Sequence, residues 1–159
     1  MKYTEFKREY ETARLKYKLP DFKQLISQFD VHFTNLEFIP KGGVVLVIRR
    51  RMQDRLSYIL GMLQGIVSPD GNSFIALNET KFFSDAEKES IVRLIRSLMF
   101  YFRKSSVLDI KTSPEKDAEF IKEVAKFWDK EIEDLLPIFT KLRDGWNITE
   151  TEESGHYFG

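Results

Sequence analysis

The chain has 159 residues, 42% of them hydrophobic and 31% charged, and its 25 basic and 25 acidic side chains give a formal net charge of zero. This composition excludes an intrinsically disordered chain, and the length predicts one domain that folds without a disulfide or metal. The chain contains no cysteine, which excludes disulfide bonds, thiolate metal sites and cysteine nucleophiles.

Neither a targeting segment nor a membrane-spanning helix is predicted. Residues 1–7 lack the apolar core of a signal peptide. The most apolar stretch, residues 42–67, contains five charged residues and is therefore unsuited to a hydrocarbon core. We therefore expect a cytoplasmic protein that does not interact with a membrane.

Two helices are predicted near the N-terminus. One helical face would carry Tyr3, Phe6, Tyr10, Ala13 and Tyr17, which are three and four residues apart. This helix should end at Leu19, because a residue before proline avoids the α region. A second helix is expected from about Asp21, and residues 30–43 are interpreted as an irregular connection.

The segment that follows is open to two interpretations. Residues 44–48 form a β-branched run typical of a short strand. The apolar positions nevertheless continue with helical spacing to residue 67, and we predict a single long helix over 44–67. A turn is predicted at residues 68–72. Residues 73–77 are interpreted as a brief strand or as a loop anchored by Phe74 and Ile75.

Two further long helices are predicted in the second half of the chain. Ser84 and Glu87 form a capping box at the start of a helix that should run to about Lys104. Ser113 and Pro114 begin the last helix, for which Gly145 is the predicted C-cap. A heptad spacing predicts that this helix packs along a nearly parallel partner through Ala118, Ile121, Ala125, Trp128, Ile132, Leu135, Phe139, Leu142 and Trp146.

The predicted fold class is therefore all-α. Three long helices, over 44–67, 84–104 and 114–144, form a bundle, and the N-terminal helix pair packs against them. One minor β element at 44–48 or 73–77 is the alternative. We expect a single helical domain over residues 1–148 and a flexible tail over residues 149–159.

The most distinct polar feature is a cluster of four arginines, Arg49, Arg50, Arg51 and Arg55. Three consecutive helical residues fan over about 200 degrees, so the first three cannot all face one phosphate backbone. Arg51 and Arg55 do share a face, and guanidinium groups bind phosphate well. The cluster supports a polyanion-binding hypothesis. Because the electrostatic footprint of a nucleic-acid binder is incomplete here, we favour the other interpretation, a solvated face that pairs with the acidic C-terminal helix.

Candidate metal and catalytic sites have little support in the sequence. His32 and His156 are the only histidines, and the single Glu-x-x-His pattern runs from Glu153 to His156. A di-iron bundle needs two such pairs and two more glutamates. No spacing of carboxylates or serines selects a catalytic pair. We therefore predict no metal site, no cofactor and no catalytic residue. Whether the protein is an enzyme stays open, and we favour a non-enzymatic protein.

Apolar surface is the remaining functional signal. The aromatic first helix and the heptad positions offer more apolar faces than a minimal bundle needs, and aromatic residues concentrate at interfaces. Trp128 and Phe139 are candidates for an interface or for the core. The leading hypothesis is a non-enzymatic protein-protein interaction module, with a homodimer as one form of it. A nucleic-acid-binding protein that uses Arg49–Arg55 is the alternative.

Overall fold

The computed structural model describes residues 3–29, 31, 43–111 and 113–147. Within these ranges the chain forms six α-helices, one 3-10 turn and no strand. The helices are α1 (Tyr3–Tyr17), α2 (Phe22–Phe29), α3 (Gly43–Val67), α4 (Phe74–Glu79), α5 (Asp85–Ile110) and α6 (Pro114–Gly145), with the 3-10 turn η1 at Thr80–Phe82. This confirms the all-α bundle of three long helices.

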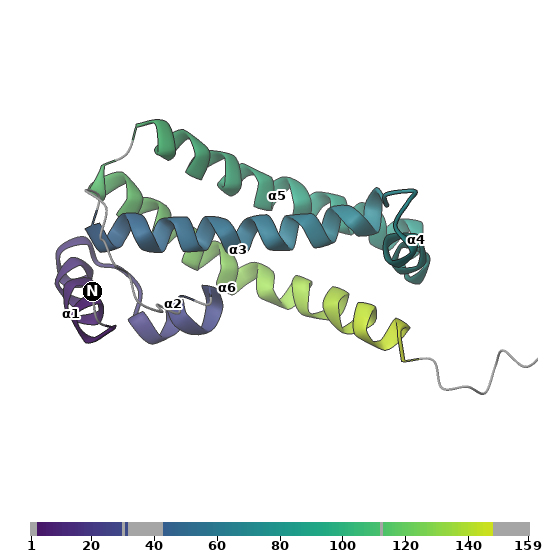
Figure 1. The fold of residues 1–159 in the computed structure, drawn as a ribbon, viewed down its shortest axis with the longest axis horizontal. Coiled ribbons are helices and arrows are strands. Elements are labelled where there is room, and N and C mark those ends of the chain that lie inside the picture. Colours follow the sequence, from purple (N-terminus) through teal and green to yellow (C-terminus); the bar gives the residue numbers. More distant parts are fainter. Residues whose placement is uncertain (1–2, 30, 32–42, 112, 148–159) are drawn as a thin grey trace, which may run out of the picture.

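The central one of the three long helices is α3, which lies between α5 and α6 and packs against both (Figure 1). α5 runs back along α3, and α6 returns in the opposite direction to α5. The predicted N-terminal pair, α1 and α2, covers the first part of α3 at the end of the bundle where α6 begins. The α4 helix lies at the opposite end, so the two ends of the bundle have different surroundings.

Side-chain caps begin α5 and α6 as predicted. The Ser84 hydroxyl accepts a hydrogen bond from the Glu87 amide, and the Glu87 carboxylate accepts one from the Ser84 amide. At α6 the Ser113 hydroxyl accepts a hydrogen bond from the Lys116 amide, and Pro114 lies in the first turn. The α5 helix runs to Ile110 rather than ending near Lys104. No glycine or proline interrupts these added residues, and Leu108 among them is buried.

The predicted β alternatives were wrong. Residues 44–48 lie in α3, and all five are buried among the packed helices, so a helix places their apolar side chains in the core as well as a strand would. Residues 74–79 form α4 because Ser73 caps it by accepting a hydrogen bond from the Ala76 amide. Phe74 and Ile75 are 73% and 58% exposed, so they do not anchor a loop to the core.

Gly145 was predicted as a C-cap but is the last residue of α6, and Trp146 occupies the cap with an ordinary φ of −90°. The structure gives another reason for glycine at this position. A Cβ atom on Gly145 would lie 2.5 Å from carbon atoms of the Phe82 ring. Absence of a side chain therefore permits the η1 turn to approach the end of α6.

The heptad positions of α6 are buried over most of their length, as the packing hypothesis requires. Trp128 is 3% exposed, and its ring lies 5.1 Å from the Phe29 ring, so it is a core residue of this chain. Phe139 is partly buried against the same core. Ile132 and Trp146 depart from the pattern, because they are 40% and 44% exposed.

Tyr10 fastens α1 to the start of α2. Its side chain is buried, and its hydroxyl donates a hydrogen bond to the Pro20 carbonyl at 2.6 Å. The Tyr10 ring lies 5.0 Å from the Phe22 ring. Burial, reinforced by the nearby charge of Glu11, raises the pKa of the Tyr10 phenol.

Several predictions fall on residues outside the described ranges, including the domain boundary at 148, the tail over 149–159, and the segments that contain His32 and His156. Among the described residues, none of the helices combines the length and hydropathy needed to cross a membrane.

Candidate functional site

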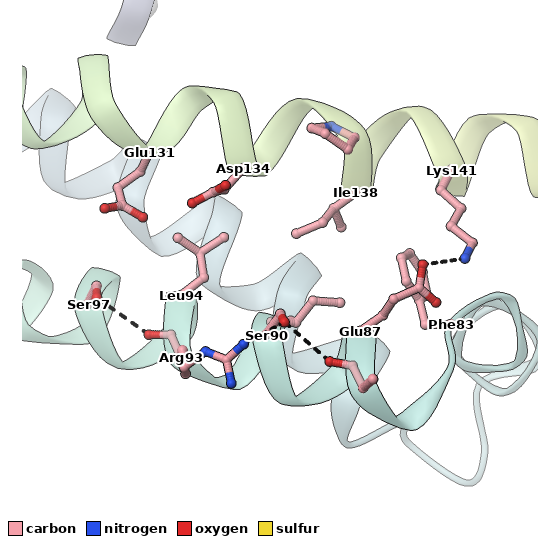
Figure 2. A pocket seen from close by; sticks show the side chains of 13 residues that line it. Phe83, Glu87, Ser90, Arg93, Leu94, Ser97, Glu131, Asp134, Ile138 and Lys141 are labelled. Carbon is pink, nitrogen blue, oxygen red and sulfur yellow. Dashed lines mark hydrogen bonds and ion pairs between the residues drawn. The ribbon is translucent and has the colours of Figure 1, made fainter.

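A groove of about 610 Å³ lies between the first half of α5 and the second half of α6 (Figure 2). It exists because both helices pack against α3 much more than against each other. Phe83, Ile91 and Leu94 are buried at its base, and Ile138 reaches towards them from α6. The groove therefore has an apolar floor that is continuous with the core of the bundle.

The wall contributed by α6 is acidic. Figure 2 shows the carboxylates of Glu131 and Asp134 pointing from α6 towards α5. The Glu131 side chain is only 14% exposed, and the exposed Lys130 ammonium lies 3.8 Å from its carboxylate. The wall contributed by α5 carries Ser90, Arg93 and Ser97. The groove is therefore asymmetric in charge across its width.

An ion pair crosses the groove at the end nearest the α5 N-terminus. The Lys141 ammonium donates a hydrogen bond to the Glu87 carboxylate, and it lies 5.3 Å from the centre of the Phe83 ring. The hydrogen bond from Lys141 lowers the pKa of Glu87 to about 2, with help from the hydrogen bonds of the Ser84 amide and hydroxyl. Glu87 thus caps α5 and joins it to α6.

The two serine hydroxyls that line the groove are hydrogen-bonded within α5. Ser90 donates to the Ala86 carbonyl at 3.2 Å and Ser97 to the Arg93 carbonyl at 3.4 Å. A serine nucleophile would instead need its proton directed at a base. No group of three or more metal-ligating side chains occurs in the described part of the chain. An apolar floor between polar walls is typical of a recognition site.

The prediction that Arg49 belongs to a polyanion-binding surface was wrong. The Arg49 side chain is fully buried, and its Nε lies 2.9 Å from the carboxylate of Asp117, which is also fully buried. The Arg49 guanidinium also donates to the Ser105 carbonyl at 3.1 Å and to the Asp109 carboxylate. Arg49 therefore joins α3, α5 and α6 inside the bundle, where no polyanion reaches it.

The other three arginines lie nearer the surface, and two of them have acidic neighbours. The Arg50 side chain is 57% exposed and lies 3.8 Å from Asp109, while Arg51 is 49% exposed and lies 3.8 Å from Asp54. The Arg55 guanidinium lies 5.6 Å from the centre of the Tyr58 ring. These neighbours offset part of the positive charge. Polyanion binding by Arg50, Arg51 and Arg55 stays a prediction.

A second apolar surface lies at the same end of the bundle as the groove. We call it the α4 face, and it consists of Phe74, Ile75, Leu77 and Trp146. No residue of α4 is buried, and the Phe74 and Trp146 rings lie 6.4 Å apart. The Trp146 indole donates to the Glu79 carboxylate at 3.0 Å, which holds its ring beside α4. Exposed apolar side chains gathered in this way are typical of a contact site.

Comparisons with protein-family models, with curated proteins and with solved structures gave no match. The groove, the α4 face and the surrounding charges therefore carry the functional argument alone.

Proposed function

We propose that the chain is a non-enzymatic protein-interaction module that holds a helical segment of its partner in the groove between α5 and α6. The observation that carries the proposal is the apolar floor set between polar walls. An amphipathic helix binds such a groove by placing apolar side chains at positions i, i+3 or i+4, and i+7 against the floor. The polar side of the helix then stays in water.

The dimensions of the groove agree with this mode of binding. The walls run from Ala86 to Ser97 and from Glu131 to Lys141, or about 17 and 15 Å at a rise of 1.5 Å per residue. Such a length corresponds to about three helical turns. Three turns of a helix that is roughly 10 Å across take up more space than the 610 Å³ of the groove, so only the apolar side chains would enter it and the partner backbone would lie at its mouth.

A titration with a designed peptide tests the proposal. The probe is a fluorescein-labelled amphipathic peptide of roughly 18 residues, with a leucine stripe and uncharged flanks. Ser90→Trp places an indole in the groove, whereas Glu89→Trp places one on the adjacent exposed position outside it. We expect saturable fluorescence anisotropy with the unmodified protein, binding about tenfold weaker with Ser90→Trp, and no change with Glu89→Trp. Absence of saturable binding, or equal loss in both variants, contradicts the proposal.

Self-association is a second candidate function, and the exposed α4 face supports it. Two copies related by a two-fold axis would cover this face with itself, because an isologous interface joins the same patch on both subunits. Sedimentation equilibrium over a range of concentrations should then show a dimer. Phe74→Ser combined with Ile75→Ser should yield a monomer, while Leu15→Ser, at a 77% exposed position on α1, should not. A monomer at every concentration contradicts self-association.

A further inference from the structure

The charges around the groove also bear on the kind of helix that fits it. At one end Glu87 and Lys141 neutralise each other. Farther along, the α6 wall presents Glu131 and Asp134, whereas the α5 wall presents Arg93 (Figure 2). A partner lying in the groove would therefore have an acidic wall on one side and a basic group on the other.

The two carboxylates of the α6 wall form only one ion pair within 4 Å among the described residues. Glu131 has only the exposed Lys130 ammonium at 3.8 Å, and Asp134 forms no ion pair with any described residue. Arg93 lies on the opposite wall, where its guanidinium donates to the Ser90 hydroxyl at 2.7 Å. Negative charge beside a partly buried apolar floor attracts a cation more strongly than it would in open water.

We infer that the occupant of the groove is a cationic amphipathic helix whose apolar stripe is bordered, on the flank facing α6, by two Lys or Arg side chains one turn apart. This inference rests on the proposed function. Glu131 and Asp134 are three residues apart, so they share one face of α6 with a rise of about 4.5 Å between them. Cations at positions i and i+3 or i+4 of a partner helix have the matching separation. Arg93 repels cations on the other flank, which fixes how the partner is rotated about its axis.

Three peptides test the inference. All carry the same leucine stripe, and the flank contains two lysines, two glutamines or two glutamates at positions i and i+4. We expect the lysine peptide to bind about five- to tenfold more tightly than the glutamine peptide at low salt, as two partly exposed ion pairs would give. The glutamate peptide should bind most weakly. The preference should shrink at about 1 M salt, where the Debye length falls to about 3 Å.

Two double variants with the same change in net charge show whether the preference comes from the α6 wall. Glu131→Gln combined with Asp134→Asn should abolish it. Glu9→Gln combined with Glu119→Gln removes two exposed carboxylates outside the groove and should preserve it. Circular dichroism confirms that each variant is folded.

The outcomes separate this inference from the proposal on which it rests. If no peptide binds, the proposed function is overturned together with the inference. If the lysine and glutamine peptides bind equally, or the glutamate peptide binds best, the groove still holds a helix but the inference is overturned. Tighter binding of the lysine peptide that requires Glu131 and Asp134, and not Glu9 and Glu119, supports both.

Discussion

Two ion pairs join α6 to its neighbours at opposite ends of the bundle, and they lie in contrasting surroundings. Arg49 and Asp117 are fully buried where α3, α5 and α6 meet. Lys141 and Glu87 are each 42% exposed, at one end of the groove. We call the end of the bundle that contains Arg49 and Asp117 the closed end, and the end that contains Lys141 and Glu87 the open end. The comparison indicates that the buried pair contributes more to the fold, whereas the exposed pair borders the groove that we propose as a binding site.

Because one pair is buried and the other is exposed, the two pairs also differ in how much their loss should destabilise the fold. Burying two charges costs several kcal/mol of hydration per ion, which their attraction offsets only if the pair stays intact. An exposed pair keeps most of its hydration and is screened by water and salt, so it contributes little to stability. Removing one partner should therefore be severe at the closed end and mild at the open end.

The largest effect is expected at the closed end. Asp117→Ala should lower the free energy of unfolding by about 2–4 kcal/mol, because the buried Arg49 guanidinium keeps the partly exposed Asp109 but loses its fully buried partner. Urea denaturation measures this value. The double variant Arg49→Met, Asp117→Leu should recover much of the loss, since it leaves neither charge in the core. A loss below about 1 kcal/mol for Asp117→Ala would mean that the pair is not needed for the closed end.

The next largest effect is expected at the open end, from packing rather than charge. Gly145→Ala would place a Cβ 2.5 Å from the Phe82 ring and should cost about 1–3 kcal/mol through overpacking. Gly61→Ala is the matched control, because it is helical and its new Cβ meets no atom within 4 Å. That control should stabilise the protein by about 0.5–1 kcal/mol. Equal thermal shifts for the two variants would refute the close approach of Phe82.

A smaller effect is expected where α1 meets α2. Tyr10→Phe should cost about 1 kcal/mol, because it removes the hydrogen bond to the Pro20 carbonyl. The raised pKa of Tyr10 adds a pH dependence. An unfolded chain loses the phenol proton above about pH 10 while the folded chain keeps it, so stability falls as pH rises past this value. Denaturation at pH 8 and above pH 10 should show a steeper fall for the unmodified protein than for Tyr10→Phe.

The smallest effect on stability is expected for Lys141→Met, at the open end. It should leave the unfolding transition nearly unchanged and raise the pKa of Glu87 from about 2 towards its ordinary range. Because that pKa is lowered in the folded chain, the pair stabilises the fold above the ordinary glutamate pKa of about 4.3, and this contribution is lost as pH falls towards 2. NMR titration of the Glu87 carboxyl measures the change. An unaltered pKa in Lys141→Met contradicts the assignment of its cause.

Features that depend on local sequence could be predicted. The capping box at Ser84 and the Ser113–Pro114 start are set by residues a few positions apart, and the heptad positions of α6 by side-chain spacing. The burial of Arg49 could also have been predicted from its spacing, which the polyanion-binding hypothesis did not take into account. Arg49 lies four residues after Val45 and three before Met52, on the buried face of α3.

Features that depend on the packing of distant segments could not be predicted. The groove arises from the way α5 and α6 separate while both remain packed against α3, and no local pattern near Leu94 or Ile138 encodes that separation. The partners that Arg49 finds on α5 and α6 lie more than 50 residues after it in the sequence. The exposure of Phe74 likewise depends on where α4 meets the end of α6, so hydrophobicity alone misassigned it to the core.

The central claim is that the open end binds a helix, and mapping the binding surface tests it most directly. ¹⁵N-labelled protein would be titrated with the glutamine-flanked peptide while backbone amide shifts are recorded by NMR. We expect the largest shifts along Ala86–Ser97 and Glu131–Lys141, with little change around Arg49 and Asp117. Saturating shifts that centre on the α4 face or on the closed end, or no shifts at all, would contradict the account.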